Sequence, residues 1–167
     1  MTDQISETRQ DPAGGTGPVL VAVDFTADST AALIWACGYA SSVGTGVVVL
    51  HVVHDPEDAP GYYRKGEEDL LRPMEDVAVE MIDQFLEQVA KKRPDLDALE
   101  GAEQVLVKGI PATRILETAE TTGARLIVMG SRGRTGLPHL LLGSKAERVV
   151  QMSPIPVTIV KATTNND

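Results

Sequence analysis

The amino-acid sequence predicts an α/β fold in which a parallel sheet is covered by helices on both faces. Short apolar runs, most of them rich in valine, alternate along the chain with segments of helical spacing, in the order β-α-β-α-β-α-β-α-β. The apolar runs are continuous, as is typical of strands buried on both faces. Such strands, alternating with helices, indicate a parallel sheet between two helical layers.

The first strand and helix follow from the first apolar segment. The run PVLVAVD at 18–24 is short and apolar, which predicts a buried strand. FTADSTAAL comes next, and we expect Asp28 or Ser29 to be the N-cap of a helix. That helix extends to about Val43 and ends at Gly44, because glycine readily adopts the left-handed conformation that often follows a helix.

A second strand, GVVVLHVV at 46–53, leads into a polar insertion without apolar period at 54–69. An irregular insertion of this length is more often functional or mobile than structural. It begins at the end of a strand and contains Tyr62 and Tyr63. We therefore expect it to be mobile without ligand and to order partly over a bound ligand, with the tyrosines covering a base. A disordered surface loop with two incidental tyrosines is the alternative.

The remaining elements complete the alternation. Apolar residues at helical spacing from Met74 to Val89 predict a helix with Pro73 in its first turn. The pattern then predicts strands at 102–109, 124–130 and 155–161, separated by helices at 110–123 and 144–152.

The length of the chain indicates the number of domains, and its net charge limits the classes of ligand. A chain of 167 residues has the size of a single domain, which we assign to 18–161, with a disordered tail at 1–17 and a polar tail at 162–167. The formal net charge of −9 argues against nucleic-acid or anionic-membrane binding, because both need a basic face. A small anionic ligand is compatible with this charge, since local donors determine its site.

The cysteine content and the hydropathy of the chain indicate its cellular location and exclude some kinds of site. The single cysteine, Cys37, excludes an intramolecular disulfide and a zinc cluster, and we expect it to be buried in an alanine-rich helix. No apolar run approaches the length of a membrane span, and the polar N-terminus has no signal-peptide core. We therefore expect a cytoplasmic protein.

A glycine-rich stretch, GSRGRTGLPHLLLGS at 130–144, follows the fourth strand. In a parallel sheet, ligands bind beyond the carboxyl ends of the strands, where this stretch begins. Glycines let backbone N–H groups approach a ligand, and a helix starting at Ser144 offers unpaired N–H groups and a dipole that favours an anion. This combination predicts a phosphate cradle. A tight turn followed by an N-capped helix is the alternative, which needs only one or two glycines.

The spacing of the glycines distinguishes among nucleotide motifs. It is neither the P-loop pattern nor the dinucleotide fingerprint, which requires glycines after the first strand. It fits G-x2-G-x9-G-[ST], filled by Gly130, Gly133, Gly143 and Ser144. Together with AVDFTADSTAAL, VVVLHVV, VKGIPATRIL and SPIPVTIVK, this motif resembles the universal stress protein family over 18–161.

The resemblance implies a flavodoxin-like, Rossmann-like three-layer sandwich whose five-stranded parallel sheet has the order 3-2-1-4-5. It also implies that the ligand is ATP or another adenine nucleotide, and that the protein is a homodimer. In this strand order the last strand, PIPVTIVK at 154–161, lies at an edge. A bare apolar edge strand invites aggregation, so we expect it to pair with the same strand of a second copy.

Ten residues are candidates for the nucleotide site. The resemblance implies a site formed by Ala22, Asp24, Val52, Met129, Gly130, Arg132, Gly133, Gly143, Ser144 and Lys145. It implies that Asp24 approaches the ribose or phosphates, that the backbone of Val52 meets adenine, and that Gly143 to Lys145 lie over the phosphates. A carboxylate at the ligand end of a parallel strand can also hold Mg²⁺ through one oxygen. Capping the turn after the strand is the alternative role of Asp24.

Three positions keep a second interpretation. Lys145 replaces a residue that is small or apolar in many relatives, so it either contacts phosphate or is solvated in the first turn of its helix. Arg132 likewise either contacts phosphate or is solvated. Arg125 stands where an acidic residue often precedes the fourth strand, at the end of that strand far from the site.

Three functions fit the sequence. The first is a nucleotide-binding regulatory protein that is not an enzyme and hydrolyses ATP slowly at most. The second is an adenylyl transferase or related enzyme, whose histidine-pair and S-G-G-x-D-S motifs are absent. The third is a dimerisation or protein-interaction module whose crevice is empty or holds another adenine ligand such as cyclic AMP. His51 is expected to pack in the core, and His54 and His139 have no visible catalytic partner, so we expect no catalytic residue.

Overall fold

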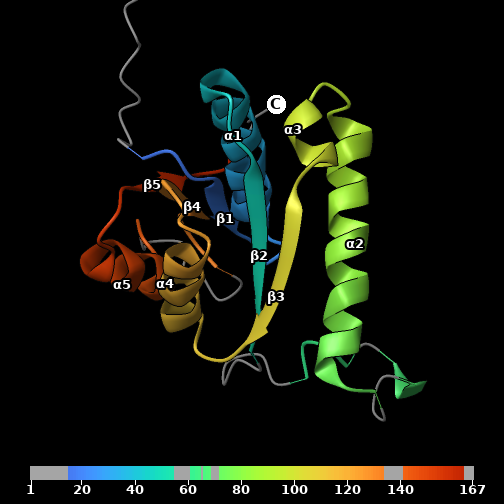
Figure 1. Cartoon of the computed structure of the whole chain (residues 1–167). Coiled ribbons are helices and arrows are strands. Elements are labelled where there is room, and N and C mark those ends of the chain that lie inside the picture. Colours follow the sequence, from blue (N-terminus) through green and yellow to red (C-terminus); the bar gives the residue numbers. More distant parts are fainter. Residues whose placement is uncertain (1–14, 55–60, 65, 69–71, 134–140, 164–167) are drawn as a thin grey trace, which may run out of the picture.

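The computed structural model describes residues 15–54, 61–64, 66–68, 72–133 and 141–163 (Figure 1). In this part of the chain, strands and helices follow the predicted order, with one additional short helix before the third strand. The strands are β1 (Val19–Ala22), β2 (Val47–Val53), β3 (Glu103–Lys108), β4 (Leu126–Gly130) and β5 (Val157–Val160). The helices are α1 (Ala27–Val43), α2 (Met74–Lys92), α3 (Asp97–Glu100), α4 (Pro111–Thr121) and α5 (Ser144–Met152).

The strands form one parallel sheet in the order β3-β2-β1-β4-β5, which confirms the predicted fold class. β1 lies at the centre, where Val21 pairs with Val49 of β2 on one side and with Val128 of β4 on the other. The chain therefore winds outward from β1 to β3 and then returns to the other side of β1. Ligands of parallel sheets bind at such a reversal, beyond the carboxyl ends of the strands.

Helices cover both faces of the sheet because alternate strand residues point to opposite sides. On one face, Val21 packs in a cluster with α1 and with Phe85 of α2. On the other face, Leu20 packs in a cluster with Ile115 of α4 and Val149 of α5. Figure 1 shows α4 and α5 on the side of the sheet away from α2. Both faces of the central strand are therefore buried, which explains why its apolar run is continuous.

Helix α1 begins earlier than predicted. Phe25 has a φ of 67°, a left-handed conformation that turns the chain sharply after β1, and the helix starts at Ala27. Its N-cap is Thr26, whose Oγ1 accepts a hydrogen bond from the Ser29 N–H at 3.2 Å. The prediction of Asp28 or Ser29 as N-cap was therefore wrong. Asp28 instead lies in the first turn, where its side chain reaches residues outside the helix.

Other boundaries follow the predictions more closely. Helix α1 ends before Gly44, whose φ of 70° is left-handed as expected. Pro73 is the residue before α2 rather than a member of its first turn, because its ψ of 139° is extended. The short helix α3 between α2 and β3 was not predicted, since four residues are too few to show an apolar period.

The insertion predicted as a lid at 54–69 lies partly outside the described residues, and its mobility stays a prediction. Tyr63 is described, and it is 1 % exposed in a cluster with Val53 and Val77. Its hydroxyl lies 2.9 Å from Nε2 of His51 in β2. Tyr63 therefore anchors the insertion to the sheet, and the prediction that it covers a base was wrong. His51 is buried in the core, as predicted.

Strand β5 lies at the edge of the sheet, as predicted. It pairs with β4, no other described strand flanks it, and its residues are half-buried. Pairing with a second copy stays a prediction. Of the two predicted tails, residues 1–14 and 164–167 lie outside the described part, whereas Gly17 accepts a hydrogen bond from the Thr45 hydroxyl at 3.0 Å.

Cys37 lies fully buried in α1, as predicted. Burial raises the pKa of its thiol to about 11, so the reactive thiolate is scarce at neutral pH. In the part of the chain that the structure describes, no helix has both the length and the apolar character needed to cross a membrane.

Candidate functional site

A cleft of about 160 Å³ lies at the carboxyl ends of β1, β2 and β4, beside the start of α5. All ten residues predicted for the ligand site border it, namely Ala22, Asp24, Val52, Met129, Gly130, Arg132, Gly133, Gly143, Ser144 and Lys145. The fold thus brings to one place residues that are far apart in the sequence.

Part of the cleft is apolar. Val52 and Met129 are buried at the ends of their strands, 8 % and 7 % exposed, and border the cleft together with Leu50. Ile115 and Pro111 of α4 add to this surface. These two residues could not be predicted from the sequence, because α4 reaches the cleft only through its packing on the sheet. An apolar surface of this kind suits an uncharged planar ring.

The start of α5 forms a polar part of the same cleft. Gly143 is its N-cap, and among the described residues no side chain caps the helix. Ser144, Lys145 and Ala146 of the first turn border the cleft. The first N–H groups of a helix lack partners within the helix, and the helix dipole is positive at this end. This part of the cleft therefore favours an anion.

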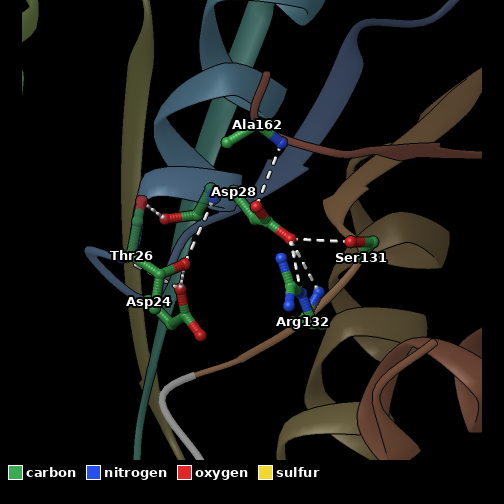
Figure 2. A network of polar contacts seen from close by, with 7 residues as sticks. Asp24, Thr26, Asp28, Ser131, Arg132 and Ala162 are labelled. Atoms are coloured by element: carbon green, nitrogen blue, oxygen red, sulfur yellow. Dashed lines mark hydrogen bonds and ion pairs between the residues drawn. The ribbon is translucent and has the colours of Figure 1, made fainter. Parts of the chain in front are cut away.

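Asp24 lies where the chain leaves β1. Its Oδ1 accepts hydrogen bonds from the Thr26 N–H at 3.2 Å and from the Thr26 hydroxyl at 2.6 Å (Figure 2). Its Oδ2 faces the glycine-rich loop, since a Cβ added at Gly133 would lie 3.1 Å from it. Oδ1 therefore stabilises the turn after β1, which confirms the capping role that the sequence analysis gave as the alternative for Asp24. Oδ2 lies beside the loop at the cleft.

Ser131 fixes the start of the loop from three directions. Its N–H donates to the carbonyl of Val160 in β5 at 2.8 Å, and its hydroxyl donates to Oδ2 of Asp28 at 2.6 Å. Its carbonyl accepts from the N–H of Gly143 at 2.7 Å. Because Gly143 precedes α5, the last bond ties the two ends of the loop together. The start of α5 is thereby held next to the end of β4.

Asp28 supports the site, a role that the sequence analysis missed. This residue is 6 % exposed, and its Oδ2 also accepts from the Arg132 N–H at 3.1 Å, with Nε of Arg132 at 3.7 Å. Its Oδ1 accepts from the Ala162 N–H at 3.0 Å (Figure 2). Burial raises the pKa of Asp28, but the hydrogen bonds from Ser131, Ala162 and Arg132 and the charge of Arg132 outweigh it and hold the pKa below its ordinary value.

Close packing explains two of the loop glycines. A Cβ at Gly130 would lie 2.9 Å from Cβ of Asp28, so β4 approaches α1 this closely only without a side chain there. Gly133 approaches Asp24 in a similar way. A Cβ at Gly143 would meet its nearest neighbour, the Ser131 carbonyl, at 3.4 Å, which is an ordinary contact. Packing among the described residues therefore requires glycine at 130 and favours it at 133, but does not require it at 143.

The described histidines and carboxylates do not form a metal-binding or catalytic cluster. Nδ1 of His51 lies 2.8 Å from the Val23 carbonyl and its Nε2 bonds Tyr63, so both ring nitrogens are used in the core. His51 and His54 both border the cleft, whereas His139 lies outside the described residues. The described residues include no group of three or more His, Cys, Asp or Glu side chains that could hold a metal ion. A cation at Asp24 would need further oxygens from water or from a ligand.

The sequence as a whole matches a known family. Residues 15–161 match the Universal stress protein family. The chain belongs to this family. This universal stress protein is 28 % identical over 153 residues to Universal stress protein MJ0577 of Methanocaldococcus jannaschii, and the match covers 86 % of this chain and 93 % of that protein.

Two further relatives match this universal stress protein over less of their own length. It is 52 % identical over 56 residues to Universal stress protein MJ0531 of the same organism, which is 34 % of this chain and 33 % of that relative. It is 34 % identical over 146 residues to Universal stress protein Rv1996 of Mycobacterium tuberculosis. This match covers 86 % of this chain but 44 % of Rv1996, so the chain spans less than half of that relative.

Solved structures of universal stress proteins share the fold. UspA from Lactobacillus plantarum matches with a TM-score of 0.67 and 24 % identity, covering 86 % of this chain and 97 % of UspA. A universal stress protein solved in complex with cAMP matches at 0.62 and 20 % identity, covering 89 % and 99 %. The Archaeoglobus fulgidus protein solved in complex with dAMP matches at 0.53 and 26 % identity, covering 87 % and 98 %.

Proposed function

We propose that this universal stress protein binds ATP, with adenine against the apolar part of the cleft and the phosphates over the start of α5. One observation carries the proposal: buried Val52 and Met129 border the same cleft as Arg132 and the first turn of α5, which no described side chain caps. A ligand that uses both parts has a planar, largely apolar ring at one end and an anion at the other. Adenine nucleotides have this build.

A solved relative supports an adenine nucleotide as the class of ligand. The Archaeoglobus fulgidus protein, 26 % identical, was solved in complex with dAMP. Cyclic AMP is the second candidate, because its single phosphate can also meet a helix start. ATP is favoured because Arg132 and Lys145 place two cationic side chains at the cleft beside α5. Two cations and a helix start suit several phosphates better than one.

Asp24 is the residue that would hold Mg²⁺. Asp24 borders the cleft at the end of β1, and its Oδ2 faces Gly133 of the loop. Mg²⁺ in nucleotide sites usually takes one or two protein carboxylates and completes its shell with waters and phosphate oxygens. One carboxylate at the cleft is therefore enough when the nucleotide supplies its phosphates.

The proposed role is regulatory rather than enzymatic. Rapid hydrolysis needs a group that orients an attacking water. His51 is used by its two core contacts, and Oδ1 of Asp24 is tied to Thr26. We therefore propose that ATP hydrolysis is slow at most. The proposed ligand is an intracellular metabolite, which fits the cytoplasmic location expected from the sequence.

The proposed assembly is a homodimer through β5. An edge strand exposes unpaired N–H and C=O groups, and the residues of β5 are half-buried in the single chain. Val150 and Met152 of the adjacent helix α5 are 46 % and 57 % exposed, so this helix also carries exposed apolar surface. Antiparallel pairing with the same strand of a second copy would satisfy the groups of both strands.

The proposed ligand is tested by calorimetric titration of the full-length protein with ATP, AMP and cyclic AMP, each with and without Mg²⁺. We expect ATP with Mg²⁺ to bind most tightly. Tighter binding of cyclic AMP than of ATP would favour the second candidate. If none of the three binds, the proposed function is wrong.

A further inference from the structure

We propose that Asp28 is a positioning residue of the nucleotide site: its carboxylate holds Ser131 and Arg132 in the arrangement that receives the phosphates. This inference rests on the proposed function and extends it to a residue that does not itself border the cleft. Asp28 lies in the first turn of α1, and its carboxylate points toward Ser131 and Arg132 at the start of the loop (Figure 2). Its effect on a ligand therefore acts through the loop.

In each described hydrogen bond of the Asp28 side chain, the partner is the donor and the carboxylate is the acceptor. Its Oδ2 receives the Ser131 hydroxyl and the Arg132 N–H, and its Oδ1 receives the Ala162 N–H. An ionised carboxylate only accepts hydrogen bonds and offers about four lone-pair sites, so it can satisfy all these donors at once. Charge-assisted bonds of this kind are roughly twice as strong as bonds between neutral groups. Asp28 is thus suited to fixing several backbone segments.

The donors that Asp28 holds belong to the phosphate end of the proposed site. The side chain of Arg132 is 31 % exposed and borders the cleft, while its backbone N–H is tied to Asp28. The Ser131 carbonyl holds the N–H of Gly143, the N-cap of α5. Loss of the Asp28 carboxylate should therefore loosen both Arg132 and the start of α5.

The apolar part of the cleft has separate supports. Val52 and Met129 belong to strands β2 and β4, which are held by their ladder partners and by the buried cluster around them. None of the described contacts of Asp28 involves these two residues. The binding of the phosphates should therefore depend on Asp28, whereas the binding of the adenine ring should not.

Asp28 also joins the loop to the chain that follows the edge strand. The Ser131 N–H bonds the Val160 carbonyl, and two residues later the Ala162 N–H bonds Asp28. The first turn of α1, the start of the loop and the end of β5 therefore meet at one carboxylate. Two of these three segments are anchored in the core or the sheet, so the loop is held against a rigid support.

The test is an NMR titration of the full-length protein with ATP and Mg²⁺ and, separately, with adenosine, which has no phosphate. The variants are Asp28→Ala and, as the matched control, Asp76→Ala. Asp28→Ala keeps the Cβ against which Gly130 packs. Asp76 is an exposed carboxylate in the first turn of α2 and does not border the cleft, so its removal changes the net charge equally.

We expect Asp28→Ala to weaken ATP binding about tenfold, as the loss of a charged hydrogen-bond acceptor does, and adenosine binding less than about threefold. We expect Asp76→Ala to leave both affinities within about twofold of wild type. A merely structural role would weaken both ligands equally or neither. Equal weakening, or unchanged ATP affinity in folded Asp28→Ala, therefore overturns the positioning role.

Ser131→Ala is the second variant, because it removes a single hydroxyl and threatens the fold less. It should weaken ATP by about threefold and leave adenosine unchanged, as the loss of one hydrogen bond predicts. Unchanged ATP affinity in this variant also overturns the inference. If wild type binds neither ATP nor adenosine, the proposed function itself is wrong. If wild type binds ATP and the variants keep the ATP-to-adenosine ratio, only the role of Asp28 is wrong.

Discussion

Oδ2 of Asp24 lies against the backbone of Gly133, so close that a Cβ at residue 133 would come within 3.1 Å of it. This contact joins the turn after β1 to the glycine-rich loop, and both residues border the cleft. A larger side chain at 133 must therefore displace either the loop or the Asp24 carboxylate.

Gly133→Val should weaken ATP binding at least tenfold, which is about 1.4 kcal/mol, because its branched side chain moves the loop away from Asp24. Calorimetric titration measures the effect. Gly38→Val is the matched control, since Gly38 is exposed on α1 and a Cβ there meets nothing within 4 Å. If Gly133→Val binds ATP as tightly as wild type, the nucleotide site lies elsewhere.

Tyr63→Phe should lower the free energy of unfolding by about 2 kcal/mol, because it removes the partner of a buried ring nitrogen. The carbonyl of Val23 can only accept, so Nδ1 of His51 carries the proton and Nε2 of the neutral ring accepts from the Tyr63 hydroxyl. Urea unfolding measures the loss. Tyr62→Phe, at a half-buried ring, should cost less than half as much. Equal losses would contradict the anchoring role of Tyr63.

The contribution of the Asp28 carboxylate to stability should depend on pH. The pKa of Asp28 is lowered in the folded protein, so its ionised form stabilises the fold above the unfolded pKa of about 3.9, and this stability is lost as the pH falls through the lower folded pKa. Urea unfolding of wild type and Asp28→Asn should give a larger difference at pH 7 than near pH 2. A difference that stays constant over this range would show that ionisation of Asp28 contributes nothing.

ATP hydrolysis should stay below roughly 1 per second, whereas typical enzymes turn over at about 1–10³ per second. The reason is that both ring nitrogens of His51 and Oδ1 of Asp24 have partners within the protein, and His54, the other described histidine at the cleft, belongs to no described catalytic cluster. Single-turnover assays with labelled ATP measure the rate, and Asp24→Ala shows whether any activity belongs to this site. A faster rate that is lost in Asp24→Ala would identify an ATPase instead of a binding protein.

Proline at Val157 should prevent dimerisation without unfolding the chain. The carbonyls of Pro156 and Val160 accept from the N–H groups of Ile127 and Ser131 on the β4 side, so by the two-residue period of a strand the N–H of Val157 points to the open edge. Sedimentation velocity measures the assembly, and circular dichroism checks the fold.

Thr158→Pro is the comparison for that variant. The N–H of Thr158 points toward β4, so the loss of this group should lower the stability of the folded chain. A folded Val157→Pro variant that remains dimeric would rule out pairing through β5. A wild-type protein that is monomeric at micromolar concentration would have the same consequence.

The layered fold could be predicted from the sequence because its signal is local and repeated. The continuous apolar run of β1 places Leu20 in one buried cluster and Val21 in the other, and the other strands repeat this pattern. The position of the ten candidate residues followed from the family motif together with the place of ligand sites in parallel sheets. Both signals depend on short stretches of sequence.

The role of Asp28 could not be predicted, because it depends on contacts across the chain. Thr26, Asp28 and Ser29 are all good N-cap residues, and local preference does not choose among them. The choice depends on the left-handed conformation of Phe25, which sets where α1 starts. The main partner of Asp28 is Ser131, which lies 103 residues away.

The burial of Tyr63 in the insertion could not be predicted from the sequence either. The surrounding residues are polar and lack an apolar period, which predicts a surface loop. Its burial depends on the partner that His51 offers from β2 and on the cluster with Val53 and Val77. Neither the hydrogen bond nor the cluster has a signal in the local sequence.

The most direct test of an adenine nucleotide in this cleft is to follow the backbone amides of ¹⁵N-labelled, full-length protein by NMR while ATP and Mg²⁺ are added. We predict saturable shifts at Gly130, Gly133 and Ser144, which border the cleft, and small shifts along α2, which packs on the other face of the sheet. The absence of saturable shifts at these three amides, or shifts confined to α2, would contradict the account.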